Sequence, residues 1–125
     1  MILTNEEIYN ILEKISQAFS NNENIYFPAK LNYIVQKNYQ ILKNIIDDVE
    51  KIRIQTAEKY GTKDLENNCY IIPKENLKIA EKEIDDLLKI EQEVFIKKIK
   101  YSMLDDIELT MAQMSAIMFM IEDEE

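Results

Sequence analysis

Adjacent carboxylates are the first residues in this sequence that suggest chemistry. They occur at Asp47–Asp48, Asp85–Asp86 and Asp105–Asp106. Paired acids hydrolyse glycosides or hold a divalent metal when they converge on one pocket. Neighbouring residues on a helix point about 100° apart, so each pair alone is a poor chelator. We therefore interpret the pairs as solvated helix faces, and a metal-dependent hydrolase is the least favoured class.

Other catalytic residue types are scarce. The chain has no histidine, one cysteine (Cys69) and one glycine (Gly61). Without histidine there is no Ser-His or Cys-His dyad to activate a nucleophile. One glycine cannot build the glycine-rich loops that cradle phosphates. We predict no catalytic residue, no metal site, no cofactor and no enzymatic activity.

The least ordinary group of side chains is basic and aromatic. It comprises Arg53, Lys59, Tyr60, Lys97, Lys98, Lys100 and Tyr101. Cations bind phosphate and tyrosine rings stack on planar bases, so one site built from these residues suits a small nucleotide-type anion. Such a site requires the chain after residue 93 to fold back along the end of a long helix. Scattered surface lysines would have the same composition.

The totals describe an acidic globular chain. Its 125 residues are 46% hydrophobic and 31% charged, with a net charge of −9 and a pI near 4.6. This length predicts a single domain, residues 1–125. The negative charge disfavours nucleic-acid polymers and anionic membranes as partners. No run of about 18 apolar residues spans a membrane, and the lone cysteine fits a reducing cytoplasm.

Helical periodicity dominates the first half. Thr4 and Glu7 have capping-box spacing and begin a helix over about 4–19, which turn-forming residues 20–24 end. A long central helix follows over about 28–60, and its seven seam residues recur at steps of four and three. The seam comprises Leu31, Val35, Asn38, Leu42, Ile45, Val49 and Ile52. This heptad pattern predicts a coiled coil or a broader helical homo-oligomer.

Three residues in or next to the long helix have special roles in this interpretation. Asn38 either fixes the register of the seam or faces solvent near the helix end. Gly61 follows the last periodic residue, where we expect a left-handed helix cap. Arg53 flanks the seam, where its fork can reach a carboxylate on this chain or on a neighbouring copy.

The second half alternates helical and extended patterns. We predict an extended segment at 69–72, a helix over about 75–93, and a helix over about 110–121 with a second capping box at Thr110 and Gln113. Residues 94–101 suit either a continued helix or a strand paired with 69–72, with the strand slightly preferred. In the last helix, methionines such as Met114 and Met118 form the expected buried face, and the acidic residues 122–125 close the chain. The fold class is mainly α, with α+β as the alternative if the small two-stranded element forms.

The chain resembles a family of short phage proteins of unknown function. The similarity lies in "YFPAKLNYIVQKNYQILKNIIDDVEKIR", in "EKYG", and in "IELTMAQMSAIMFMIEDEE". The resemblance implies a phage or prophage source and the host cytoplasm as location, and it implies no catalytic residues.

Two functions agree with these patterns. The first is a counter-defence binding protein that stoichiometrically captures a host factor or a small anionic defence signal. The second is an accessory or chaperone in head or tail assembly that binds another phage protein.

Overall fold

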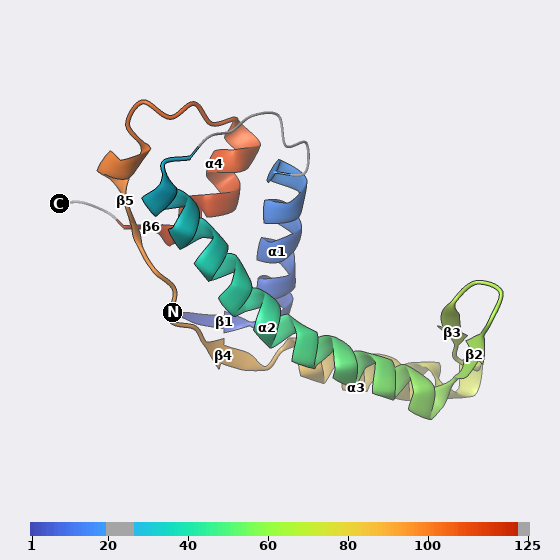
Figure 1. The fold of residues 1–125 in the computed structure, drawn as a ribbon. Helices are drawn as coiled ribbons and strands as arrows, with labels where there is room; N and C mark the ends of the chain where they lie inside the picture. Colours follow the sequence, from blue (N-terminus) through green and yellow to red (C-terminus); the bar gives the residue numbers. More distant parts are fainter. Residues whose placement is uncertain (20–26, 123–125) are drawn as a thin grey trace.

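The computed structural model describes residues 1–19 and 27–122 (Figure 1). The helices of these residues are α1 (Asn5–Phe19), α2 (Ala29–Tyr60), α3 (Lys74–Leu88) and α4 (Met111–Ile117), with 3-10 turns η1 (Tyr101–Leu104) and η2 (Met118–Met120). The short strands are β1 (Ile2–Thr4), β2 (Thr62–Asp64), β3 (Cys69–Ile71), β4 (Glu91–Glu93), β5 (Ile99–Lys100) and β6 (Ile121–Glu122). The prediction of a mainly α fold with a long central helix and small strand pairs is confirmed. The predicted turn at 20–24 and the acidic residues 123–125 lie outside the described residues.

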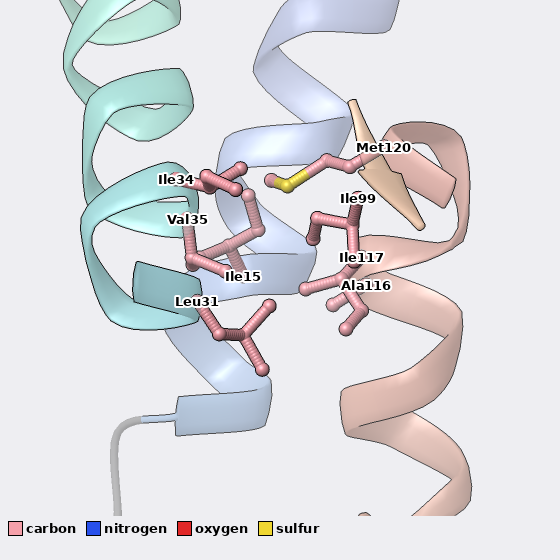
Figure 2. Close-up of a cluster of buried hydrophobic side chains, with 8 residues drawn as sticks. All are labelled: Ile15, Leu31, Ile34, Val35, Ile99, Ala116, Ile117 and Met120. Carbon is pink, nitrogen blue, oxygen red and sulfur yellow. The ribbon is translucent and has the colours of Figure 1, made fainter. Parts of the chain in front are cut away.

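The N-terminal half of α2 packs with α1 and α4 into a bundle (Figure 1). One core cluster joins all three helices to β5, as Figure 2 shows; it comprises Ile15, Leu31, Ile34, Val35, Ile99, Ala116, Ile117 and Met120. A second cluster continues along α1 and α2 toward β1 and β4, and it comprises Leu3, Ile8, Leu12, Leu42, Ile46, Val49 and Val94. Burying each large apolar side chain contributes about 1.5–3 kcal/mol, so these clusters carry most of the stability.

The C-terminal end of α2 extends beyond the bundle and packs mainly against α3 and the β2–β3 hairpin (Figure 1). We call residues 50–90 the arm. In α3, Ala80 is the one buried residue. The arm is therefore a two-helix layer with far less buried apolar surface than the bundle.

Of the three strand pairs among the described residues, two join distant parts of the chain and one is a local hairpin. β1 pairs antiparallel with β4, with Leu3 opposite Gln92. β2 and β3 form an antiparallel hairpin, and β5 pairs parallel with β6, with Ile99 opposite Ile121. The preferred pairing of 94–101 with 69–72 is therefore wrong. The hairpin partner of β3 is local, and Ile99 is instead drawn into the bundle core, where it is fully buried.

Both predicted capping boxes are present. Thr4 N–H donates to Glu7 Oε1 at 3.0 Å, and Glu7 N–H donates to Thr4 Oγ1 at 3.1 Å. Thr110 and Gln113 exchange the same two bonds at 2.9 Å and 3.1 Å. Each pair satisfies two backbone donors that the first turn of a helix leaves free.

Both later helices end before their predicted boundaries. α3 ends at Leu88, not at 93, because Asn5 Nδ2 donates to the Leu87 carbonyl at 2.8 Å. In a longer helix Glu91 would donate to that carbonyl, but Glu91 pairs with Thr4 of β1 instead. α4 ends at Ile117 and continues as η2 and β6, so the predicted helix to 121 is too long.

The turn after Ile117 changes which methionine is buried. Met120 is fully buried, whereas Met118 is 54% exposed, contrary to the prediction for that residue.

Gly61 is not a left-handed cap. Its φ is −138° and its ψ is −177°, which is extended backbone that any residue adopts. A Cβ at this position would lie 2.6 Å from the Ile71 carbonyl oxygen and 3.1 Å from the Ala57 carbonyl oxygen. Glycine is required here because the hairpin approaches the end of α2 closely.

The seam residues of α2 are used mainly within one copy of the chain. Five of the seven are buried in the protomer, namely Leu31, Val35, Asn38, Leu42 and Val49. Ile45 is half-buried, and Ile52 is 46% exposed. The buried members cannot form an interface between copies without unpacking the bundle, because α1 and α4 already cover them.

Candidate functional site

The structure divides the predicted ligand-binding residues into two groups. Lys97 is hydrogen-bonded to Asn38 on the bundle half of α2. Arg53 lies 15 residues further along that helix, which corresponds to about 22 Å, and Tyr60 lies about 33 Å away. Arg53, Lys59 and Tyr60 therefore do not share a site with Lys97, Lys98, Lys100 and Tyr101.

Arg53 is occupied by contacts between α1 and α2. Its Nη1 donates to Glu50 Oε1 at 2.9 Å, and its guanidinium lies 5.4 Å from the centre of the Tyr9 ring. Tyr9 donates its hydroxyl to the same Glu50 oxygen. Partial burial, followed by the bond to Glu50, raises the pKa of the Tyr9 hydroxyl. The sole arginine thus serves an intrachain network through a half-exposed ion pair, and not through the buried pair that the sequence suggested as one alternative.

Lys59 and Tyr60 connect α2 to α3. The Lys59 ammonium lies 4.9 Å from the centre of the Tyr60 ring and 3.4 Å from Glu83 Oε1. Hydrogen bonding with Tyr60, and then with Glu83, raises the pKa of Lys59. Asn76 Nδ2 donates to the Tyr60 carbonyl at 3.0 Å. These contacts join the two helices of the arm.

Asn38 positions the group of predicted ligand-binding residues that begins at Lys97. Its amide is fully buried and makes two hydrogen bonds with the Lys97 backbone: Nδ2 donates to the Lys97 carbonyl at 2.8 Å, and Oδ1 accepts from the Lys97 N–H at 2.7 Å. This pair resembles one step of a strand ladder, with a side-chain amide in place of a second strand. Asn38 therefore fixes the register of the 94–100 segment along α2. It neither faces solvent nor contacts a second copy.

Fixing Lys97 in this way creates a cationic surface. The Lys97 ammonium lies 5.9 Å from the centre of the exposed Tyr33 ring. Lys30 and Lys37 are three residues before and four residues after Tyr33, so they share its face of α2. Lys98 and Lys100 are exposed on the adjoining segment, followed by Tyr101, which is 55% exposed. We call two exposed groups, which the Lys97–Tyr33 contact joins, the lysine face: Lys30, Tyr33 and Lys37 on α2, and Lys97, Lys98, Lys100 and Tyr101 on the segment beside it.

The lysines of this face make no salt bridge among the described residues, and the nearest carboxylate in the strand register is Glu122, opposite Lys100 in the β5–β6 pair. Within residues 1–19 and 27–122, salt bridges involve Lys43, Arg53, Lys59 and Lys82 and none of the five lysines of the lysine face. Five lysines that make no salt bridge within the described part of the chain, together with the exposed rings of Tyr33 and Tyr101, can bind a phosphate-bearing planar molecule.

Sequence reasoning found four of the seven residues of the lysine face and missed Lys30, Tyr33 and Lys37. Their spacing on α2 is visible in the sequence as one exposed stripe. Their proximity to residues 97–101 depends on the Asn38 contact, 59 residues apart in the chain. No local signal predicts that contact.

The paired acids do not converge. Asp47 binds Lys43 at 2.9 Å and Asp86 binds Lys82 at 3.5 Å, each one turn away on its own exposed helix face. Among the described residues, no three acidic or cysteine side chains are placed to hold a metal ion. Cys69 is exposed on the β2–β3 hairpin.

No family model, curated protein or solved structure matches the chain. In the part of the chain that the structure covers, the helices are too short or too polar to cross a membrane.

Proposed function

We propose that the protein is a non-catalytic binding protein that captures a small nucleotide-type anion on the lysine face. In the phage setting implied by the family resemblance, the ligand is a defence signal held stoichiometrically in the host cytoplasm. The supporting observation is the group of five lysines, without carboxylate partners among the described residues, in a chain of net charge −9.

The charge distribution selects for a small ligand. A compact anion can contact several lysines of the face at once. A nucleic-acid polymer would extend beyond the face onto acidic surface, where like charges repel it. The exposed rings of Tyr33 and Tyr101 offer stacking for a base, and an exposed cationic surface of this kind binds more weakly as salt increases.

The test is a thermal-shift and calorimetric titration with inorganic phosphate, AMP, ADP-ribose and a cyclic dinucleotide. A bound ligand raises the melting temperature by mass action. Losing one charge-assisted hydrogen bond costs about 1.5–3 kcal/mol, so Lys97→Glu should weaken binding about tenfold or more. Lys78→Glu is the matched control, because Lys78 is an exposed lysine on α3 and the change in net charge is identical.

Binding by one of the nucleotides, lost in Lys97→Glu and kept in Lys78→Glu, supports the proposal. If no nucleotide raises the melting temperature, or if both variants lose the same affinity, capture on the lysine face is wrong. Binding of phosphate as tightly as of the nucleotides would show that the tyrosines contribute no base recognition.

A second candidate function rests on the exposed methionines of the last helical segment. Met111, the first residue of α4, is 91% exposed, and Met118, the first residue of η2, is 54% exposed. Methionine makes adaptable contact surfaces, which suits an adaptor in head or tail assembly. Recovery of phage structural proteins by pull-down, abolished by Met118→Glu and retained by Ala112→Glu, would favour this function over ligand capture.

A further inference from the structure

A partly apolar groove runs along the arm, on a surface distinct from the lysine face. It is a shallow, open groove of about 570 Å³ between α2 and α3. Ile52, Leu87 and Ile90 form its apolar part, and Lys59, Glu83 and Asp86 provide charges along it. Ile52 and Ile90 are 46% and 49% exposed, which is high for isoleucines beside a helix–helix contact.

This groove continues the buried stripe of α2. Leu42 and Val49 lie in the same seam and are covered within the bundle, where they are 0% and 4% exposed. The far end of the arm extends away from α1 and α4 (Figure 1), whereas Glu50 and Arg53 at its base contact Tyr9 of α1. Ile52 is the most exposed of the seam residues, and it lines the groove beside α3. A further helix pair laid over the groove would complete the packing that the bundle provides elsewhere.

The charge of the arm favours a second copy of the same chain as that helix pair. Residues 50–90 hold eight lysine or arginine side chains and nine carboxylates, a net charge of −1, whereas the rest of the chain carries −8. Two arms therefore meet with little net repulsion. The groove also holds both signs of charge, with Lys59 on α2 and Glu83 and Asp86 on α3. A twofold interface needs this self-complementarity, because each copy contributes the same surface.

We propose that two copies of the protein pair through this groove, with their arms antiparallel, to form a four-helix layer. In this arrangement the exposed Lys59–Glu83 ion pair of each copy faces the same pair of the other, so that each lysine also lies near the partner's carboxylates. The two bundles lie at opposite ends of the paired arms. α3 alone, with 15 residues, is about 22 Å long, and a Debye length at physiological salt is about 8 Å. The acidic bundles are thus screened from each other.

The area of the groove surface indicates how tightly two copies should bind each other. A face of two helices about 22 Å long and about 20 Å wide covers roughly 450 Å² in projection. Stable interfaces commonly bury about 800 Å² on each partner. We therefore expect a weak dimer that dissociates in the micromolar range.

The test is sedimentation of the full chain over a range from about 2 to about 200 µM, at about 0.15 M salt with reductant to keep Cys69 reduced. Ile52→Glu places a charge in the groove and should abolish the dimer. Ile54→Glu is the matched control, since Ile54 is 48% exposed on the same helix and lies about 200° away around its axis. Ile54→Glu should therefore dimerise as the parent chain does. If circular dichroism shows that Ile52→Glu does not fold, Ile90→Glu replaces it as the groove variant.

Concentration-dependent dimerisation that only the groove variants lose supports the proposal. A parent chain that is monomeric at about 200 µM overturns it, and so does equal loss of the dimer in Ile54→Glu. A spin label on Cys69 tests the orientation of the arms. Antiparallel arms keep the two labels more than about 20 Å apart, whereas parallel arms bring them together. These outcomes are independent of ligand capture, because neither Ile52 nor Ile54 belongs to the lysine face.

Discussion

Replacing Asn38 by alanine tests how the lysine face is held. The substitution removes two hydrogen bonds, of 2.8 Å and 2.7 Å, between the buried amide and the Lys97 backbone. A donor or acceptor left without its partner costs about 1–3 kcal/mol. Both backbone groups are affected, but the Lys97 side chain is exposed and water can approach from that side. We therefore expect Asn38→Ala to lower the free energy of unfolding by about 2–4 kcal/mol, near the lower half of the range for two lost partners.

The assay is urea unfolding followed by circular dichroism. Asn32→Ala is the control, because Asn32 is an exposed residue of α2 whose side-chain oxygen accepts only from Gln36, at 2.9 Å. It should change stability by less than about 0.5 kcal/mol. A loss below about 0.5 kcal/mol for Asn38→Ala, or an equal loss for Asn32→Ala, would refute the role assigned to the buried amide.

Two further substitutions test other contacts. Gly61→Ala should destabilise the protein by about 1–3 kcal/mol, because the new Cβ would lie 2.6 Å from the Ile71 carbonyl oxygen and the backbone would have to move. Thermal unfolding measures this loss, and an unchanged melting temperature would contradict the close approach. Tyr9→Phe removes the hydroxyl bond to Glu50 and should cost about 0.5–1.5 kcal/mol at pH 8. The pKa of Tyr9 is raised in the folded protein, so this contribution is complete below the unfolded pKa near 10 and is lost as pH rises through the folded pKa. Urea unfolding of both proteins at pH 8 and near pH 11 should show the difference shrinking, and a constant difference would rule out this linkage.

Features held by neighbours in sequence were predictable. The capping boxes at Thr4 and Thr110 depend on partners three residues away, and both formed as the spacing required. The long helix follows from an apolar period that no proline or glycine interrupts between residues 29 and 60.

Features that depend on distant partners were not predictable in the same way. Asn5 ends α3 through the Leu87 carbonyl, 82 residues away, so the helix stops where its own sequence would continue. The conformation of Gly61 was mistaken because a helix end and a close hairpin both select glycine.

The candidate site shows the same division. Lys97, Lys98, Lys100 and Tyr101 stand out from composition alone, because cations cluster there in an acidic chain. Grouping them with Arg53 assumed that the segment folds back along the far end of α2. The buried amide of Asn38 instead places the segment along the near end, about 22 Å away. A polar residue in an apolar stripe indicates that its side chain has a hydrogen-bond partner, but it does not identify that partner.

Because α3 has few buried side chains, folding constrains its sequence less than it constrains the sequence of the bundle. In the bundle, most inward substitutions leave a cavity or overfill the core, and selection for folding holds the sequence in place. In α3 Ala80 is the one fully buried residue and Leu87 packs against the second core cluster, whereas exposed positions outside the groove, such as Lys78, can vary in size and charge at little energetic cost. Descendants of this protein can thus acquire new binding partners by altering α3, with the fold preserved by residues that never meet those partners.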